Sequence, residues 1–191
     1  MSKLEKRVPI AVCGIVAIVI AGCAGETQPA KQAAASPKTT RKTTTEGPSC
    51  NPKEGAKAPA LAMDSMNAGR ASIVPGKVTL IDFWATWCKP CEKSFPAYQA
   101  LYTKYKGRGF EVIAVAVDEA DTKAAIPGFI KKAGAKFPVG WDDGHALADC
   151  WKPGGMPAAY IIDKKGVVRH IHERWLDDSE KQVEAQIKAL L

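Results

Sequence analysis

Trp84-Ala85-Thr86-Trp87-Cys88-Lys89-Pro90-Cys91 is the most informative stretch of this sequence. An apolar and β-branched run, 78–84, leads into it and predicts a strand buried on both faces. A helix is predicted immediately afterwards, over 90–105. In the first turn of a helix, two cysteines three residues apart can bring their sulfurs together, whereas in a strand they would point to opposite faces. We therefore expect Cys88 and Cys91 to pair where a buried strand gives way to a helix.

The position of the two cysteines at the start of a helix favours a reactive thiolate. The N-terminus of a helix offers unpaired N–H groups and positive potential, which stabilise a thiolate, and Lys89 adds a nearby cation. Cys88, at the mouth of the helix, is the expected nucleophile, and Cys91 is the expected resolving thiol. Thiol–disulfide exchange needs both, because the second thiol releases the mixed disulfide that the first one forms.

Other kinds of site also use cysteine pairs. A structural zinc site needs a second pair of ligands at short spacing, and Cys50 and Cys150 each stand alone. A c-type haem site needs histidine directly after the second cysteine, where this chain has Glu92. A peroxidase with one peroxidatic cysteine would carry threonine three residues before Cys88, and an inert buried pair is the remaining alternative. We expect neither a metal nor a cofactor.

The downstream sequence alternates between strand and helix signals. Strands are predicted over 110–117, 137–141, 158–162 and 167–172, and helices over 122–133, 143–151 and 179–191. Asp163-Lys164-Lys165-Gly166, between the last two strands, is typical of a hairpin turn. Ser179 is the expected N-cap of the last helix. This order predicts an α/β fold with a central mixed sheet covered by helices on both faces.

Composition places these elements in one folded unit. The 191 residues carry a net charge of +7, with 46% hydrophobic and 25% charged residues, which is ordinary for a globular protein. The length suits one domain with appendages. The composition excludes a collagen, a coiled coil or a multi-span membrane protein. Six cysteines are too few for a disulfide-rich scaffold.

The N-terminus has the layout of a secretory signal. Residues 1–7 carry three cations and one acid, and 8–20 is apolar. That run of about 13 residues is shorter than the roughly 20 that a transmembrane helix needs. It ends in Ile20-Ala21-Gly22-Cys23, which resembles the bacterial lipoprotein box. The pattern predicts a signal peptide over 1–22 and a lipid on Cys23, with an uncleaved anchor as the alternative.

Residues 23–49 are predicted to be the lipidated cysteine followed by a disordered tether. From residue 24 onward this stretch has no aromatic or large aliphatic side chain and cannot bury enough apolar surface to fold. Its lysines and arginine hold much of the positive charge, which argues against nucleic-acid binding by the folded part. That part is expected to span 50–191.

Residues 80–96 strongly resemble the thioredoxin superfamily. With the lipoprotein signal, they are most similar to its extracytoplasmic TlpA/ResA-type thiol–disulfide oxidoreductases, and the resemblance extends over roughly 55–190. A second motif, Gly155-Met156-Pro157, matches the cis-proline segment of that family. The resemblance implies that Pro157 lies against the active-site disulfide and that the backbone of Met156 pairs with the substrate chain. Trp87 is expected in the exposed apolar rim around the sulfurs.

Asp82 stands among apolar residues of the first buried strand, so its pKa should be raised. Such a carboxyl could accept the proton of Cys91 as that thiol attacks. Thioredoxin has aspartate at the matching place, whereas TlpA/ResA-type proteins often do not. The alternative is an edge-strand aspartate facing water. Ser94 also departs from the pattern, because many ResA-type proteins have an acidic residue there.

Cys50 and Cys150 lie outside the motif, and exported proteins leave few thiols unpaired. We expect a structural disulfide between them, and some TlpA-type proteins have a similar extra bridge. Two free thiols are the alternative.

The expected protein is a monomeric thiol–disulfide oxidoreductase of the bacterial cell envelope, held on the membrane by the lipid on Cys23 and facing an extracytoplasmic compartment. Its expected partners are exported proteins that contain cysteine and an upstream redox partner. The resemblance implies reduction, as in cytochrome c maturation or oxidase assembly. The alternative is a non-catalytic thioredoxin-like binding module.

Overall fold

The computed structural model describes residues 50–191. The predicted signal peptide, Cys23 and the predicted tether lie outside these residues.

A sheet of seven strands forms the centre of the described region. Its strands are β1 (Ala62–Ser65), β2 (Gly69–Ser72), β3 (Val78–Trp84), β4 (Phe110–Ala116), β5 (Val139–Trp141), β6 (Ala158–Ile162) and β7 (Val168–His172). They follow the order β2-β1-β5-β4-β3-β6-β7. The pairs β3–β4 and β4–β5 are parallel, and the other pairs are antiparallel. The predicted mixed sheet is confirmed.

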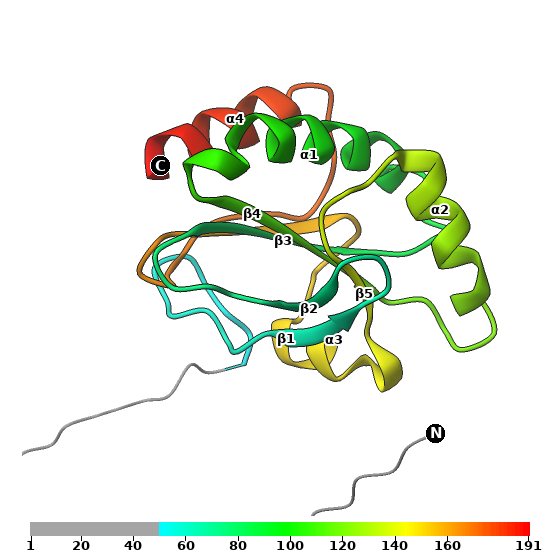
Figure 1. Ribbon diagram of the computed structural model, residues 1–191. Helices are drawn as coiled ribbons and strands as arrows, with labels where there is room; N and C mark the ends of the chain where they lie inside the picture. Colours follow the sequence, from blue (N-terminus) through cyan, green and yellow to red (C-terminus); the bar gives the residue numbers. More distant parts are fainter. Residues whose placement is uncertain (1–49) are drawn as a thin grey trace, which may run out of the picture. The chain divides into compact units, whose positions relative to one another are not determined.

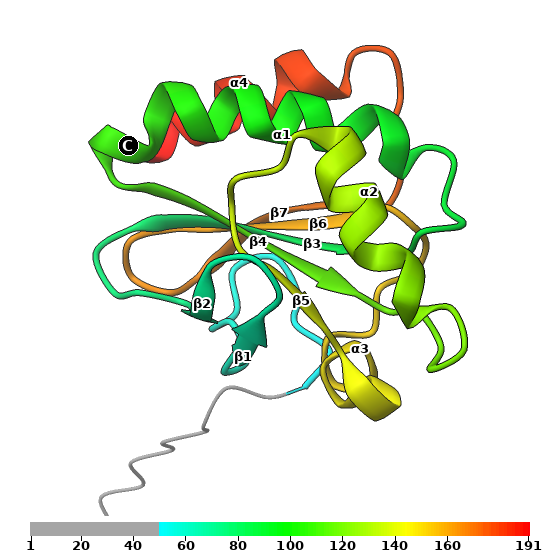
Figure 2. The same cartoon turned by 45° about the vertical axis from the view of Figure 1, so that its right-hand side comes forward.

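Helices cover both faces of this sheet. They are α1 (Cys91–Tyr105), α2 (Ile126–Ala133), α3 (Ala146–Trp151) and α4 (Ser179–Leu190). Figures 1 and 2 show α1 and α4 side by side on one face, and α3 on the other. Among residues 50–191, no helix has the length and apolar character needed to cross a membrane. The expected thioredoxin-like architecture is confirmed.

The central strand β3 is buried along its whole length, because both faces of the sheet are covered. Leu80 and Trp84 point into the apolar layer under α1, whereas Ile81 and Phe83 point into the layer on the opposite face. In that second layer Phe83 lies 6.0 Å from the ring of Trp151 at the end of α3. The continuous apolar run that predicted this strand thus reflects burial on both faces.

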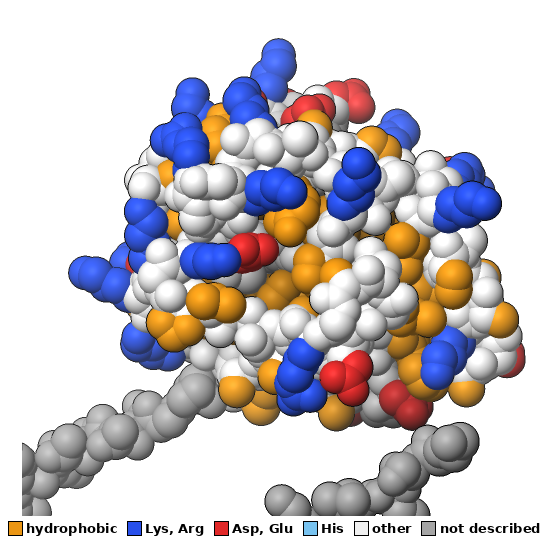
Figure 3. Space-filling view, viewed as in Figure 1, with side chains coloured by type: hydrophobic (Ala, Val, Ile, Leu, Met, Phe, Trp, Pro, Cys, Tyr) orange, Lys and Arg blue, Asp and Glu red, His pale blue; other side chains and the backbone are white. Residues whose placement is uncertain are grey.

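Charged side chains are spread over the surface. In Figure 3, lysine and arginine side chains lie singly around the visible face, with apolar side chains between them. Several join acidic partners, as in Lys104–Glu184 at 2.6 Å and Arg70–Asp64 at 3.3 Å. Exposed pairs of this kind contribute at most about 1 kcal/mol each. The fold therefore depends mainly on its two apolar layers.

Two features differ from the sequence analysis. The hairpin of β1 and β2 was not predicted, because its short strands lack a β-branched run, although Met63 and Ala71 face each other across it and are buried. The expectation that Ser179 caps α4 is wrong. Asp178 occupies the cap position, and the Ser179 hydroxyl instead accepts the N–H of Leu176 at 2.8 Å.

Candidate active site

Cys88 and Cys91 lie where β3 ends and α1 begins. Their sulfurs are bonded at 2.02 Å. Cys88 retains 4% of its accessible surface and Cys91 retains none. Cys88 is thus the sulfur that a partner can reach, and Cys91 lies behind it.

The backbone at the helix mouth faces the outer sulfur. The N–H of Cys91 donates to Cys88 Sγ at 3.3 Å. Pro90 occupies the N-cap position without a side-chain cap, so no side chain competes for the N–H groups of this first turn. Because N–H groups and the positive end of a helix favour negative charge, this geometry can stabilise a thiolate on Cys88.

Three charged side chains surround this helix mouth. Glu92 lies 3.6 Å from the ammonium of Lys132 and 3.4 Å from that of Lys89. These two cations lower the pKa of the Glu92 carboxyl. Lys89 itself is highly exposed, so its charge reaches the sulfurs largely through solvent.

The Met156–Pro157 peptide bond is cis. Pro157 is buried and Met156 is half-buried. β6 starts at the next residue, Ala158, which pairs with Phe83 of β3. The proline therefore immediately precedes the strand that neighbours β3, which leads to Cys88. Trp87 is 60% exposed. The same end of the sheet therefore holds the sulfur pair, the cis-proline and an exposed aromatic ring.

Asp82 is fully buried on β3. Side chains alternate along a strand, so Asp82 shares the face of Leu80 and Trp84 that packs under α1. Neither of its carboxylate oxygens has a hydrogen-bond partner among the described residues. Burial raises the pKa of Asp82 well above the usual carboxyl value. Burial likewise raises the pKa of Tyr98, and the neighbouring Asp82 raises it further.

A second disulfide joins Cys50 and Cys150, whose Cα atoms lie 4.5 Å apart. Cys150 lies in α3, and the N–H of Asn51 donates to its carbonyl at 2.5 Å. The bridge therefore fastens the start of the described chain to the helix that precedes the Met156–Pro157 segment.

The sequence analysis missed the contact between Thr86 and Asp118. Asp118 is fully buried, and both of its carboxylate oxygens accept the N–H of Thr86 at 3.1 Å. Its signal lies in the strand register, since each residue comes two positions after the paired residues Trp84 and Ala116.

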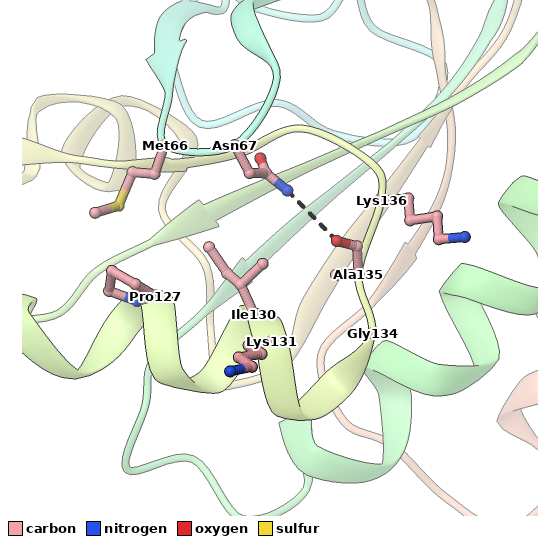
Figure 4. A pocket seen from close by; sticks show the side chains of 8 residues that line it. All are labelled: Met66, Asn67, Pro127, Ile130, Lys131, Gly134, Ala135 and Lys136. Carbon is pink, nitrogen blue, oxygen red and sulfur yellow. Dashed lines mark hydrogen bonds between the residues drawn. The ribbon is translucent and has the colours of Figure 1, made fainter.

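A separate hollow lies between the β1–β2 turn and α2 (Figure 4). Met66, Pro127 and Ile130 make it apolar, and Lys131 and Lys136 lie at its side. None of the predicted site residues contributes to it. The sulfur pair and the cis-proline thus remain the candidate site.

Known proteins are similar to this chain in sequence. Residues 55–171 match the AhpC/TSA family model. The thiol-disulfide oxidoreductase ResA of Bacillus thuringiensis (strain Al Hakam) is 34% identical over 138 residues, which cover 71% of this chain and 78% of that relative. The ResA of Bacillus subtilis (strain 168) is 34% identical over 117 residues, which cover 60% of this chain and 64% of the relative.

Solved structures agree with the sequence relatives. A crystal structure assigned as the thiol:disulfide interchange protein DsbE of Chlorobium tepidum has a TM-score of 0.67 and 32% identity, over 73% of this chain and 98% of that one. StoA of Bacillus subtilis has a TM-score of 0.58 and 22% identity, over 69% and 97% of the two chains. The second likeness concerns the fold alone.

Proposed function

Because the chain belongs to the AhpC/TSA family of thioredoxin-like proteins and is a thiol–disulfide oxidoreductase, we propose that it reduces disulfides of exported proteins through Cys88 and Cys91. The observation that carries the proposal is the bond between these sulfurs in the first turn of α1. Ala85, rather than threonine, stands three residues before Cys88. This residue and the partner sulfur of Cys91 favour disulfide exchange over peroxide chemistry.

The reaction proceeds by two sulfur displacements. The Cys88 thiolate attacks one sulfur of the substrate disulfide, forms a mixed disulfide and expels the other substrate sulfur as a thiolate. Cys91 then attacks Cys88 Sγ, the mixed bond breaks, and the substrate leaves with both sulfurs reduced. Two electrons pass to the substrate, and the Cys88–Cys91 disulfide forms. An upstream dithiol partner restores the reduced pair.

Asp82 takes part in the second displacement. Cys91 must lose its proton to become a nucleophile, and its surroundings are dry. In its ionised form, the buried and unpaired Asp82 carboxyl under α1 accepts that proton.

Docking of the substrate uses the surface beside Cys88. The backbone of Met156 pairs with an extended substrate segment, Pro157 shapes the groove, and the exposed Trp87 ring covers apolar substrate atoms. This assignment is supported by the position of the cis-proline next to β3 and by the exposure of Trp87.

The N-terminal signal pattern and the second disulfide both support an extracytoplasmic location. The signal pattern over 1–22 and the lipid site at Cys23 would hold a monomeric domain, 50–191, on the outer side of a bacterial membrane. A bridge such as Cys50–Cys150 suits an oxidising compartment. Cytochrome c maturation and oxidase assembly are the processes in which we expect its substrates.

A Cys91→Ser variant of the full chain tests this function. Without the resolving thiol, the mixed disulfide on Cys88 cannot be released, so exported proteins should be captured covalently in cells. Release by a reductant, followed by mass spectrometry, identifies both the partner and its bridging cysteine.

The matched control is the double variant Cys88→Ser, Cys91→Ser, from which the captured proteins should be absent. Capture that persists in the control, or a Cys91→Ser variant that captures nothing while the parent chain still exchanges disulfides, contradicts the proposal. A parent chain whose sulfur pair does not exchange with a dithiol would instead indicate a binding module.

Asp82→Asn should slow resolution and raise stability at neutral pH. Loss of a general base typically costs about a hundredfold or more in rate. Because burial raises the pKa of Asp82, the folded state keeps a proton that the unfolded state has already lost. The stability of the parent therefore falls as pH rises above the usual carboxyl pKa, and asparagine removes this loss. Stopped-flow resolution of a mixed disulfide and urea unfolding at several pH values measure the two effects.

Asp163→Asn is the control of opposite sign. Burial raises the pKa of Asp163, but N–H donation by Val167 and pairing with Arg169 outweigh it, and the net pKa is lowered. This variant should lose stability above the usual carboxyl pKa and leave resolution unchanged. The proposed role of Asp82 would be contradicted if the Asp82→Asn variant and the parent had the same pH dependence of unfolding free energy and the same rate of resolution.

A further inference from the structure

Thr86 and Asp118 lie at corresponding points of two neighbouring strands. Trp84 at the end of β3 pairs with Ala116 at the end of β4, and Thr86 and Asp118 follow two residues later. Since the carboxyl ends of parallel strands meet at the same edge of a sheet, both loops leave at the end where α1 begins (Figure 2). The topology thus places a buried carboxylate beside the loop that carries Cys88.

Three hydrogen bonds join Thr86 to the carboxylate of Asp118. The N–H of Thr86 donates to both carboxylate oxygens of Asp118 at 3.1 Å, and the Thr86 hydroxyl donates to Oδ1. Asp118 is fully buried. Hydrogen bonds to a carboxylate are about twice as strong as those between neutral groups, and a buried acceptor that loses its donor is costly. The contact is therefore expected to persist in solution.

The backbone of Asp118 is held by a contact with β5. The indole N–H of Trp141, on β5, donates to the Asp118 carbonyl at 2.7 Å. The Lys123 ammonium lies 3.8 Å from the centre of the Trp141 ring, and the N–H of Val117 donates to Trp84 at 2.8 Å. Asp118 is thus a fixed point to which the loop of Thr86 is attached.

We propose that Asp118 is a positioning residue, which through Thr86 holds the turn that carries Cys88 at the mouth of α1. The inference rests on the proposed function. Thr86 lies inside the turn closed by the Cys88 N–H and the Ala85 carbonyl, 3.0 Å apart. A shift of this turn moves Cys88 Sγ relative to the Cys91 N–H that faces it.

The contact matters most in the reduced protein. The S–S bond ties Cys88 to α1 in the oxidised protein, and this tie is lost on reduction. The turn then depends on non-covalent contacts, and the Thr86–Asp118 contact keeps Cys88 Sγ near the N–H groups that stabilise its thiolate. Stabilising the thiolate raises the reactivity of Cys88 and favours the reduced pair.

Thr86→Val tests this role, because valine keeps the shape and the N–H but removes the hydroxyl donor. Attack of Cys88 on a small disulfide should slow about tenfold, as expected for a misplaced reacting group. The equilibrium of the full chain with glutathione should shift about threefold or more toward the disulfide. Thr86→Ser, which restores the hydroxyl, should bring both values back to within about twofold of the parent.

A double-mutant cycle with Asp118→Asn identifies the partner. Both substitutions break one contact, so the double variant should be no worse than the more affected single variant. Asp163→Asn is the matched control: it is a buried aspartate that also accepts backbone N–H groups, from Lys165 and Val167, but at the opposite end of β6. It should change neither the rate nor the equilibrium.

Three results would overturn the inference: a Thr86→Val variant that matches the parent in both measurements, a serine variant that fails to restore them, or additive effects in the cycle. The threonine variants decide the matter even if Asp118→Asn does not fold. A parent chain that exchanges disulfides normally in these experiments leaves the proposed function intact, whereas a parent without exchange overturns that function as well.

Discussion

A Cys88→Ser variant of the full chain should lose catalysed disulfide reduction by about a thousandfold or more, because a serine hydroxyl cannot replace a thiolate nucleophile. Cys88 is the only residue of the pair with any accessible surface, so we expect that Cys91 cannot take over the first attack. The initial rate of reduction of a disulfide-bonded protein such as insulin, above the uncatalysed rate, measures the loss. Unfolding in urea checks that the variant remains folded.

Comparing Cys88→Ser with Cys91→Ser distinguishes the roles of the two sulfurs. That variant should still form one mixed disulfide per molecule but lose multiple turnovers. Cys50→Ala with Cys150→Ala is the control that removes the two sulfurs of the other bridge, and it should keep turnover under conditions where it is folded. A Cys88→Ser variant that retains stoichiometric attack, or a Cys91→Ser variant that does not attack, would reverse the assigned roles.

The sequence predicted the parts of the fold whose local pattern and tertiary burial agree. β3 and β4 are mostly apolar and lie between two covered faces, so their composition already distinguishes them. α1 begins within one residue of its predicted start, because a buried strand and the cysteine motif precede it. In these segments neighbouring residues already determine the structure.

The parts that were missed depend on distant contacts. β1 becomes a strand because its Ser65 pairs with Gly140 of β5 and Met63 faces Ala71, and neither contact has a local signal. The Thr86–Asp118 contact joins residues 32 positions apart, and it appears only once β3 and β4 are set in parallel register. Local sequence motifs therefore indicated the cysteine pair but not the buried carboxylate that contacts its loop.

Removing the bridge between Cys50 and Cys150 should lower the free energy of unfolding by about 4–5 kcal/mol, if a cross-link acts by restricting the unfolded chain. The cysteines are 100 residues apart, so the bridge closes most of the described chain into one loop. Urea unfolding of Cys50→Ala with Cys150→Ala, with the active-site pair kept oxidised, measures the change. The m-value should also rise, because an open unfolded chain exposes more surface.

The dependence of stabilisation on loop length also distinguishes the two disulfides of this protein. Cys88 and Cys91 are only three residues apart, and loop-closure entropy grows with the logarithm of loop length, so opening their bond should cost roughly 3 kcal/mol less. The pair proposed to cycle is therefore the one whose reduction costs less stability, while the long bridge fastens the start of the described chain to α3. A loss below about 1 kcal/mol on removing the long bridge would contradict a structural role and turn attention to its own reactivity.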